Sequence, residues 1–428
     1  MIRLFDGLAE CWSCGYNTHM IENKIRHEKY VLAAVYDKDE EKALAMLSEL
    51  ALLTDTAGGE CVCKVTQHLE TPNPSTYIGK GKAEEISALI DELGADGVIC
   101  DDELTAVQIR NLSDILNVKV IDRTILILDI FAAHAMTSEG KLQVEMAQLE
   151  YRASHLAGIG KALSRLGGGI GTRGPGESKL ETDKRAIRRR ISSLRSEVKR
   201  LKQNRDTGRQ KRTQSGIPVA AIVGYTKAGK STLLNRITNA GVKEEDRLFA
   251  TLDPATRLCT LPDGMEVLFT DTVGFISKLP HDLIDAFRST LEEAKYADII
   301  IHVVDASDPE ADMHMDVVYE TLHDLGITGK PVITVFNKMD MVKDGELLRD
   351  IRADMTIRTS MKNGDGKEGF LEKVRDLILR GQKHIDMMIP FNEGDKLSLI
   401  RRRGRVIKEE YLPEGTHIEA YVPESTGI

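Results

Sequence analysis

Apolar residues recur with two different periods along the chain, and the pattern changes near residue 138. Between residues 30 and 121, short apolar runs alternate with segments whose apolar residues recur every three or four positions. Short runs bounded by polar residues predict buried strands, and the longer period predicts amphipathic helices. We expect strands at 30–36, 61–66, 97–100 and 118–121, and helices at 40–53, 83–93 and 105–112. Strands that alternate with helices predict a parallel sheet covered by helices.

From Ser138 onward the helical period continues without strands. Two seams step by three and four residues: Leu142, Met146, Leu149, Ala153 and Leu156, then Ile187, Ile191, Leu194, Val198 and Leu201. Narrow seams of this kind are typical of paired helices, and a short connection predicts antiparallel packing. The connection, residues 166–177, has six glycines in twelve residues. Arms of about 27 residues would place this loop roughly 40 Å from their base.

After the polar stretch 206–216, the alternation of strands and helices returns. An apolar run at 218–223 leads into a glycine-containing loop that opens a helix. The loop fits the pattern G-x-x-x-x-G-K-[ST] and comprises Gly224, Tyr225, Thr226, Lys227, Ala228, Gly229, Lys230, Ser231 and Thr232. Such a loop surrounds phosphate with backbone N–H groups, its lysine reaches the β and γ phosphates, and its serine hydroxyl ligates Mg²⁺. We therefore predict nucleotide binding, with Lys230 catalytic and Ser231 a metal ligand.

Three further motifs follow in the order that a guanine-nucleotide site requires. They are Asp271, Thr272, Val273 and Gly274; Asn337, Lys338, Met339 and Asp340; and Ser360, Met361 and Lys362. We expect Asp271 to hold Mg²⁺ through water and the Gly274 N–H to meet the γ-phosphate. A carboxylate at Asp340 accepts the paired N–H donors of guanine, which adenine lacks. Each motif alone resembles an ordinary turn, but the ordered set predicts a GTP-binding domain.

The first switch segment is expected at Phe249, Ala250 and Thr251, where Thr251 would offer an oxygen to Mg²⁺ and serve catalysis. The residue after Gly274 is Phe275, whose ring cannot hydrogen-bond a water molecule. Phosphoryl transfer to water needs an oriented water. We therefore predict slow intrinsic hydrolysis that a partner must stimulate.

Charge is concentrated in one segment. The chain has a net charge of −9, yet residues 178–213 contain fourteen Lys or Arg and only four Asp or Glu. Such a segment predicts a polyanionic partner, although a solvated helix face is the simpler alternative. Because no groove-reading motif for duplex DNA occurs, folded RNA is the better match. The predicted RNA contacts are Gly171, Thr172, Arg173, Gly174, Arg188, Arg189, Arg190, Lys199 and Arg200.

Composition indicates the cellular compartment in which the protein acts. No apolar run reaches membrane-spanning length, and the first residues lack the pattern of a secretory signal, so we expect a cytoplasmic protein. Six cysteines favour a reducing compartment. Cys11 and Cys14 with Cys61 and Cys63 are a possible zinc set, but an alternating strand explains the second pair.

The expected fold class is α/β and multidomain. Residues 1–25 form a leader of unclear structure, 26–137 an N-terminal α/β domain with a parallel sheet, and 138–206 an antiparallel helical hairpin. A linker at 207–216 precedes a Ras-like P-loop GTPase domain at 217–383 and a small α+β domain at 384–428. The segment 77–82 precedes a helix but lacks the full phosphate-loop pattern, so we expect an ordinary loop there.

Together these features resemble the HflX family of GTPases. The marks of this resemblance are Tyr77–Lys82, Asp122–Thr124, Asp129–Phe131, Glu139–Glu145, Gly171–Glu177 and Leu180–Asp183. The resemblance implies a cytosolic, Mg²⁺-dependent GTPase that binds the large ribosomal subunit and its rRNA and splits stalled or idle ribosomes, often under stress. It also implies that the glycine-rich loop reaches toward the peptidyl-transferase centre.

The chain departs from the family at Lys227, where an Asn is usual and helps related GTPases to bind a monovalent cation. Lys227 could supply this positive charge itself or point to solvent, so the resemblance leaves the monovalent cation open. We expect the protein to act as a monomer.

The alternative function is a nucleotide-gated binding module, a ribosome-assembly checkpoint or a regulator of a membrane protein complex, without splitting activity.

Overall fold

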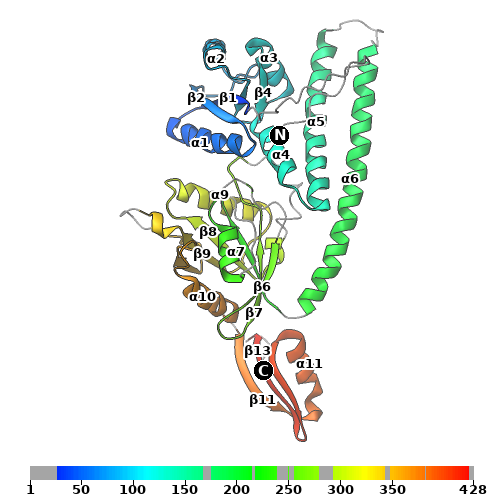
Figure 1. Ribbon diagram of the computed structural model, residues 1–428. Coiled ribbons are helices and arrows are strands. Elements are labelled where there is room, and N and C mark those ends of the chain that lie inside the picture. Colours follow the sequence, from blue (N-terminus) through cyan, green and yellow to red (C-terminus); the bar gives the residue numbers. More distant parts are fainter. Residues whose placement is uncertain are drawn as a thin grey trace, which may run out of the picture. The chain divides into compact units, whose positions relative to one another are not determined.

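The computed structural model describes residues 27–166, 175–214, 217–238, 249, 255–278, 293–342, 348–380 and 382–423. The chain divides into two compact units (Figure 1). The first comprises residues 1–199 with two short segments, 246–252 and 277–287. The second comprises 200–245, 253–276 and 288–428. Cys11 and Cys14 lie outside the described residues.

The first unit contains a four-stranded parallel sheet. Its strands are β1 (Lys29–Tyr36), β2 (Glu60–His68), β3 (Gly97–Cys100) and β4 (Lys119–Asp122), in the order β2-β1-β3-β4. Helices α1 (Glu40–Thr56), α2 (Lys80–Leu93) and α3 (Ala106–Leu116) connect them. Val31, Val98, Ile86 and Leu112 meet in the core between sheet and helices. The predicted strand–helix alternation is confirmed.

Local signals fix where these helices begin and end. The Thr105 side chain accepts a hydrogen bond from the Gln108 N–H, and the Gln108 side chain accepts one from the Thr105 N–H, which starts α3 with a capping box. Gly94 ends α2 with left-handed backbone, at φ 61°. Asn117 ends α3 in the same way, at φ 53°.

One helix was missing from the sequence prediction. Helix α4 (Arg123–His134) begins where the Asp122 carboxylate accepts a hydrogen bond of 2.9 Å from the Ile125 N–H. Its apolar residues are buried on several sides rather than along one stripe. Such a helix lacks amphipathic periodicity, so the run 125–128 gave no helical signal.

The two long helices are α5 (Ser138–Leu166) and α6 (Pro175–Gln214). On α6 the predicted seam residues Ile191 and Leu194 are buried, but on α5 the most buried apolar residues are Val144 and Ala147. The difference arises because α5 also packs against α3 and α4 and so has a second apolar face.

Helix α6 continues through residues 207–214, which composition predicted to be a linker. Polar composition alone does not stop a helix when neither proline nor a run of glycine interrupts it. The described part of α6 is therefore longer than the predicted arm. The predicted domain boundaries stay predictions.

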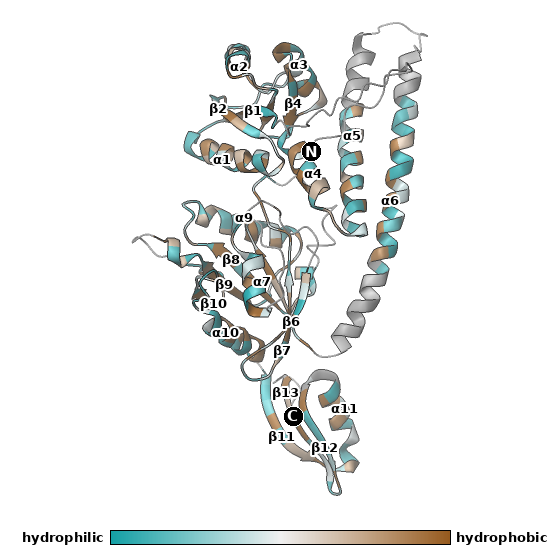
Figure 2. Cartoon of the chain, viewed as in Figure 1, coloured by the Kyte–Doolittle hydropathy of each residue, from teal (hydrophilic) through white to brown (hydrophobic). Residues whose placement is uncertain are grey.

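The second unit contains a six-stranded sheet, and apolar residues line its strands (Figure 2). The strands are β5 (Val219–Gly224), β6 (Ala255–Thr260), β7 (Glu266–Asp271), β8 (Ile299–Asp305), β9 (Val332–Asn337) and β10 (Met355–Arg358). Their order is β10-β9-β8-β5-β7-β6, and only β6 runs antiparallel to its neighbour. Among the described residues, the helices around it are α7 (Lys230–Thr238), α9 (Ala311–Asp324) and α10 (Lys367–Leu379). Ile222, Phe269, Ile301 and Phe370 share its core.

The C-terminal part of the second unit is a small α+β structure. Strands β11 (Gln382–Ile389), β12 (Arg405–Leu412) and β13 (Gly415–Pro423) form an antiparallel sheet in the order β11-β13-β12. Helix α11 (Gly394–Arg403) contributes Ile400 to a core with Ile385, Ile418 and Val422. Within the described part of the chain, no helix is both long enough and apolar enough to span a membrane.

The buried Arg123 offers a test of the first unit. Its side chain is 2% exposed and pairs with Glu49 and, at 2.8 Å, with Asp101. Arg123→Met removes the cation between two buried carboxylates, so we expect a loss of about 3–5 kcal/mol in the free energy of unfolding. Urea unfolding followed by circular dichroism measures it.

The matched control is Arg110→Met on α3, where an exposed guanidinium lies 3.8 Å from Asp114. Removing an exposed pair changes stability by less than about 1 kcal/mol. Equal losses in the two variants would contradict a special role for the buried charge.

Candidate nucleotide site

The site begins where β5 turns sharply into α7. Gly224 has φ 155°, and a Cβ there would lie 2.3 Å from the Val303 carbonyl oxygen of the neighbouring strand. Gly229 has φ 98°, and a Cβ there would lie 2.3 Å from the Asn337 side chain. Only glycine fits both positions. Helix α7 starts at Lys230, so its N-terminal N–H groups face the loop.

Lys230 is buried in the loop that it follows. Its Nζ donates hydrogen bonds to the carbonyl oxygens of Gly224, at 3.0 Å, and Tyr225, at 2.8 Å. Burial lowers the pKa of Lys230 to about 8, although the carboxylate of Asp271 opposes this shift. A buried cation held only by neutral carbonyl groups is well prepared to receive an anion.

Ser231 and Asp271 bring two oxygen ligands together. The Ser231 hydroxyl donates to a carboxylate oxygen of Asp271 at 2.9 Å, and Asp271 is fully buried. The Thr272 hydroxyl donates to the Ile222 carbonyl at 2.7 Å and so ties this strand end to β5. Paired hydroxyl and carboxylate oxygens beside a phosphate loop suit Mg²⁺, which prefers hard oxygen ligands.

Gly274 and Phe275 lie directly against the phosphate loop. A Cβ at Gly274 would approach Thr226 Cγ2 to 2.7 Å and Lys230 Nζ to 3.0 Å. The Phe275 N–H donates to the Gly224 carbonyl at 3.1 Å, and its carbonyl accepts from the Thr226 N–H at 2.8 Å. The Phe275 side chain is buried. The buried Thr226 hydroxyl has no hydrogen-bond partner among the described residues, as expected of a group that awaits a ligand.

The predicted base-recognition residues meet on the other side of the loop. The Asn337 amide donates to the Ala228 carbonyl at 3.0 Å, and its oxygen accepts from the Met361 N–H at 3.1 Å. Asp340 is exposed, and its carboxylate accepts a 2.6 Å hydrogen bond from the Ser360 hydroxyl. Asn337 therefore connects the phosphate loop to the segment that starts at Ser360.

Two supporting residues escaped the sequence analysis. Asp305, at the end of β8, accepts a 2.6 Å hydrogen bond from Lys338, whose backbone is left-handed at φ 60°. Arg236 on α7 donates to the carbonyl oxygens of Met361, at 2.9 Å, and Lys362. A carboxylate directly after an apolar strand was a signal for Asp305. Nothing in the sequence pointed to Arg236, because its partners lie far along the chain.

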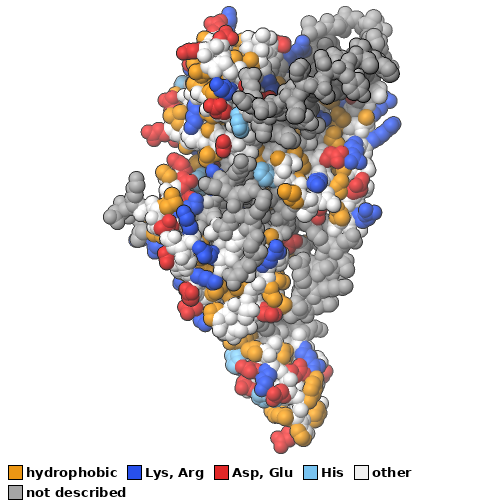
Figure 3. All heavy atoms as spheres, in the orientation of Figure 1, with side chains coloured by type: hydrophobic (Ala, Val, Ile, Leu, Met, Phe, Trp, Pro, Cys, Tyr) orange, Lys and Arg blue, Asp and Glu red, His pale blue; other side chains and the backbone are white. Residues whose placement is uncertain are grey.

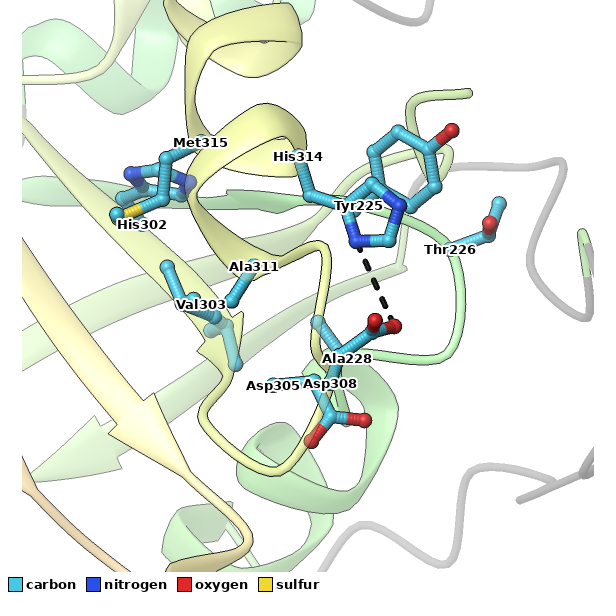
Figure 4. A pocket seen from close by; sticks show the side chains of 11 residues that line it. Tyr225, Thr226, Ala228, His302, Val303, Asp305, Asp308, Ala311, His314 and Met315 are labelled. Atoms are coloured by element: carbon cyan, nitrogen blue, oxygen red, sulfur yellow. Dashed lines mark ion pairs between the residues drawn. The ribbon is translucent and has the colours of Figure 1, made fainter. Parts of the chain in front are cut away.

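The Tyr225 side chain packs against a residue outside the phosphate loop. Its ring stacks on His314 of α9, with ring centroids 3.7 Å apart and planes at 16°, and His314 pairs with Asp308 at 3.5 Å. Figure 4 shows these side chains at a pocket that Thr226 and His302 also line. Burial lowers the pKa of His314, against the pull of Asp308.

The structure describes some of the remaining predicted site residues and not others. Ala250 and Thr251, and the loop residues Gly171, Thr172, Arg173 and Gly174, lie outside the described residues. On α6, Arg188, Arg189, Lys199 and Arg200 are exposed. Arg190 instead donates two hydrogen bonds to Glu145 of α5, at 2.8 and 2.9 Å. Figure 3 shows Lys and Arg side chains along the described part of α6.

These features together define a P-loop GTPase. The strand ends of one sheet carry a phosphate loop with a buried lysine, a serine–aspartate pair and a base-recognition segment. Family models agree with this class. A "50S ribosome-binding GTPase" model matches residues 219–338. A "GTP-binding GTPase N-terminal" model matches 45–132, and a "GTP-binding GTPase Middle Region" model matches 134–212.

The chain belongs to the HflX family of GTPases. It is 54% identical over 407 residues to GTPase HflX of Lacrimispora saccharolytica, covering 95% of this chain and 96% of the relative. It is 47% identical to GTPase HflX of Caldanaerobacter subterraneus subsp. tengcongensis, covering 92% and 91%. For GTPase HflX of Escherichia coli (strain K12) the identity is 45%, over 74% of this chain and 75% of the relative.

Gly274→Ala tests the packing around the phosphate loop. The added Cβ would press on Thr226 and Lys230, so we expect GTP hydrolysis to fall by about tenfold or more, corresponding to at least about 1.4 kcal/mol. Single-turnover hydrolysis of radiolabelled GTP measures it. Gly394→Ala is the control, because a Cβ there meets nothing within 4 Å. A rate in Gly274→Ala equal to that of the control would refute the packing argument.

Proposed function

We propose that this GTPase binds the large ribosomal subunit and dissociates stalled or idle ribosomes, with GTP hydrolysis timing its release. The proposal rests above all on the exposed cations of α6, a helix that leads directly into the GTPase fold. The description of the family model that matches the GTPase fold also supports a ribosomal partner. A cationic helix directly before a GTPase fold in the chain suits a factor whose affinity for RNA depends on the bound nucleotide.

Mg²⁺ and GTP complete the proposed active site. Ser231 would ligate Mg²⁺, and Asp271 would do so through water, with Thr251 as the third predicted ligand. The ion would neutralise charge on the β and γ phosphates when bound. Lys230 would turn from the carbonyl groups that it now contacts toward these phosphates. The resemblance to the family adds a monovalent cation, but Lys227 replaces the Asn that would hold it, so the proposal omits this cation.

Slow intrinsic hydrolysis belongs to the same proposal. The buried ring of Phe275 is 3% exposed and offers no hydrogen bond to an attacking water. The residues that orient this water must therefore come from elsewhere. We expect large ribosomal subunits to supply or order them and so to accelerate hydrolysis.

RNA contact is proposed for part of the predicted set. Arg188, Arg189, Lys199 and Arg200 are exposed and available to phosphates. Arg190 and Arg195 are also exposed, but they pair with Glu145 and Glu150 of α5, each at 2.8 Å. We propose that these two arginines bridge α5 and α6, while Arg188, Arg189, Lys199 and Arg200, for which the structure gives no such pair, meet rRNA.

Asp340→Asn tests base recognition. An amide cannot accept both guanine N–H groups, so we expect GTP affinity to fall by about tenfold or more and the preference for GTP over ATP to shrink. Competition binding with a fluorescent GDP analogue measures both quantities. Asp365→Asn, an exposed carboxylate nearby in sequence, is the control. Undiminished preference for GTP in Asp340→Asn would contradict the assigned role.

Arg188→Glu combined with Arg189→Glu tests the RNA surface. The variant reverses two exposed charges, so we expect at least about tenfold weaker binding to large subunits and a shallower salt dependence. Sedimentation with a non-hydrolysable GTP analogue measures binding, and the same gradients with 70S ribosomes measure splitting. Lys38→Glu combined with Arg110→Glu controls for net charge.

Each outcome of this experiment has a distinct meaning. Undiminished binding of the Arg188/Arg189 variant would refute the RNA surface. Binding of the unmodified protein without splitting would favour a nucleotide-gated binding module instead.

A further inference from the structure

The guanidinium of Arg236 binds two successive carbonyl oxygens of the base-recognition segment. Its Nε donates to the Met361 carbonyl at 2.9 Å, and one of its Nη atoms donates to the Lys362 carbonyl. Arg236 lies in the last turn of α7, the helix that begins at Lys230. All of these residues belong to the second unit. The helix that follows the phosphate loop is therefore tied to the segment that is expected to meet the base.

An arginine suits this pair of acceptors better than a lysine does. The guanidinium is planar and presents its N–H groups in a fixed fork, whereas the ammonium of a lysine is a single point charge. Hydrogen bonds from a cation are also stronger than those between neutral groups. Although Arg236 is exposed, its two hydrogen bonds therefore set the directions of both carbonyl groups.

The direction of the Met361 carbonyl determines where the next N–H points. A trans peptide group is planar, so its C=O and N–H point in opposite directions. Because the Met361 carbonyl faces Arg236, the Lys362 N–H points away from α7. The Met361 N–H donates to Asn337 at 3.1 Å, whereas the Lys362 N–H donates to none of the described residues. The Lys362 N–H is thus left to meet a ligand.

The rest of the segment gives this peptide group little other support. Met361 is buried in the core of the sheet, but Lys362 and Asn363 are exposed. The Ser360 carbonyl accepts hydrogen bonds from the N–H groups of residues 363–365, at 2.9–3.0 Å, and so closes the turn. These contacts do not include the peptide group between Met361 and Lys362, which Arg236 holds.

We propose that Arg236 is a positioning residue for guanine recognition, which aims the Lys362 N–H at the O6 atom of the base. The inference rests on the base-recognition role proposed for Asp340, whose carboxylate lies 2.6 Å from the Ser360 hydroxyl of the same segment. Guanine O6 is an acceptor, whereas adenine carries an amino donor at the same place. A fixed N–H there favours guanine and repels adenine.

Three nucleoside diphosphates separate these contacts in the full-length protein. Inosine diphosphate lacks the N2 amino group of GDP but keeps O6. By contrast, 6-thioguanosine diphosphate keeps N1–H and N2 and replaces O6 with sulfur, a weak acceptor. We expect Arg236→Met to weaken binding of GDP and of inosine diphosphate alike, by about tenfold, and binding of the thio analogue by less than about threefold. Isothermal titration calorimetry measures all three affinities.

Asp340→Asn should give the opposite pattern. It should shrink the preference for GDP over inosine diphosphate and leave the preference for GDP over the thio analogue within about twofold. Failure of that variant counts against the base site itself, independently of Arg236. The matched control is Arg380→Met, an exposed arginine that pairs with Asp354 at 2.9 Å, and it should leave all three affinities unchanged.

Arg236→Lys keeps one cation in place and guards against unfolding of the methionine variant. A single ammonium holds one carbonyl at a time, so the preference for GDP over the thio analogue should lie between those of the unmodified protein and Arg236→Met. An unchanged preference in both variants would overturn the proposal. So would an equal loss of affinity for all three diphosphates, since that is the result of a purely structural role.

Discussion

The nucleotide site is organised by a lysine whose charge is disfavoured by burial. Lys230 is 7% exposed, and burial lowers its pKa to about 8. The loop offers it only the carbonyl oxygens of Gly224 and Tyr225. A bound phosphate would place negative charge beside Lys230. The loop therefore holds the lysine in position for phosphate before the nucleotide binds.

Close packing around Lys230 follows from this constraint. Backbone must approach the ammonium group and the phosphates, so side chains are absent at Gly224, Gly229 and Gly274. The surrounding segments follow strands of one sheet and are also joined through side chains. Asn337 connects the phosphate loop to Met361, and Arg236 holds the carbonyl of Met361 from α7. Recognition of base and phosphate therefore shares one rigid frame.

In the first unit, a buried carboxylate also lies at the C-terminal end of a sheet strand. There it holds neighbouring helices in place. The Asp122 carboxylate accepts hydrogen bonds from the Leu104 N–H, the Ile125 N–H and the Tyr151 hydroxyl, at 3.0, 2.9 and 2.9 Å. Burial raises the pKa of Asp122, while these hydrogen bonds oppose the shift. One buried side chain thus fixes the starts of α3 and α4 and the position of α5. Carboxyl edges of parallel sheets gather loops from several strands, which explains why such residues collect there.

The elements with strong local periodicity and the residues that form the nucleotide motifs could be predicted from the amino-acid sequence alone. A phosphate loop is recognisable because glycine, lysine and serine must occur at fixed spacing on one turn of chain. Tertiary structure decided the rest. Helix α4 has no amphipathic stripe because it is buried on several sides, and α5 buries Val144 and Ala147 because it packs on two sets of neighbours. The pairs Arg190–Glu145, Arg236–Met361 and Lys278–Asp101 join residues 45, 125 and 177 positions apart. No local pattern encodes such contacts, since their energy depends on geometry that only the folded chain creates.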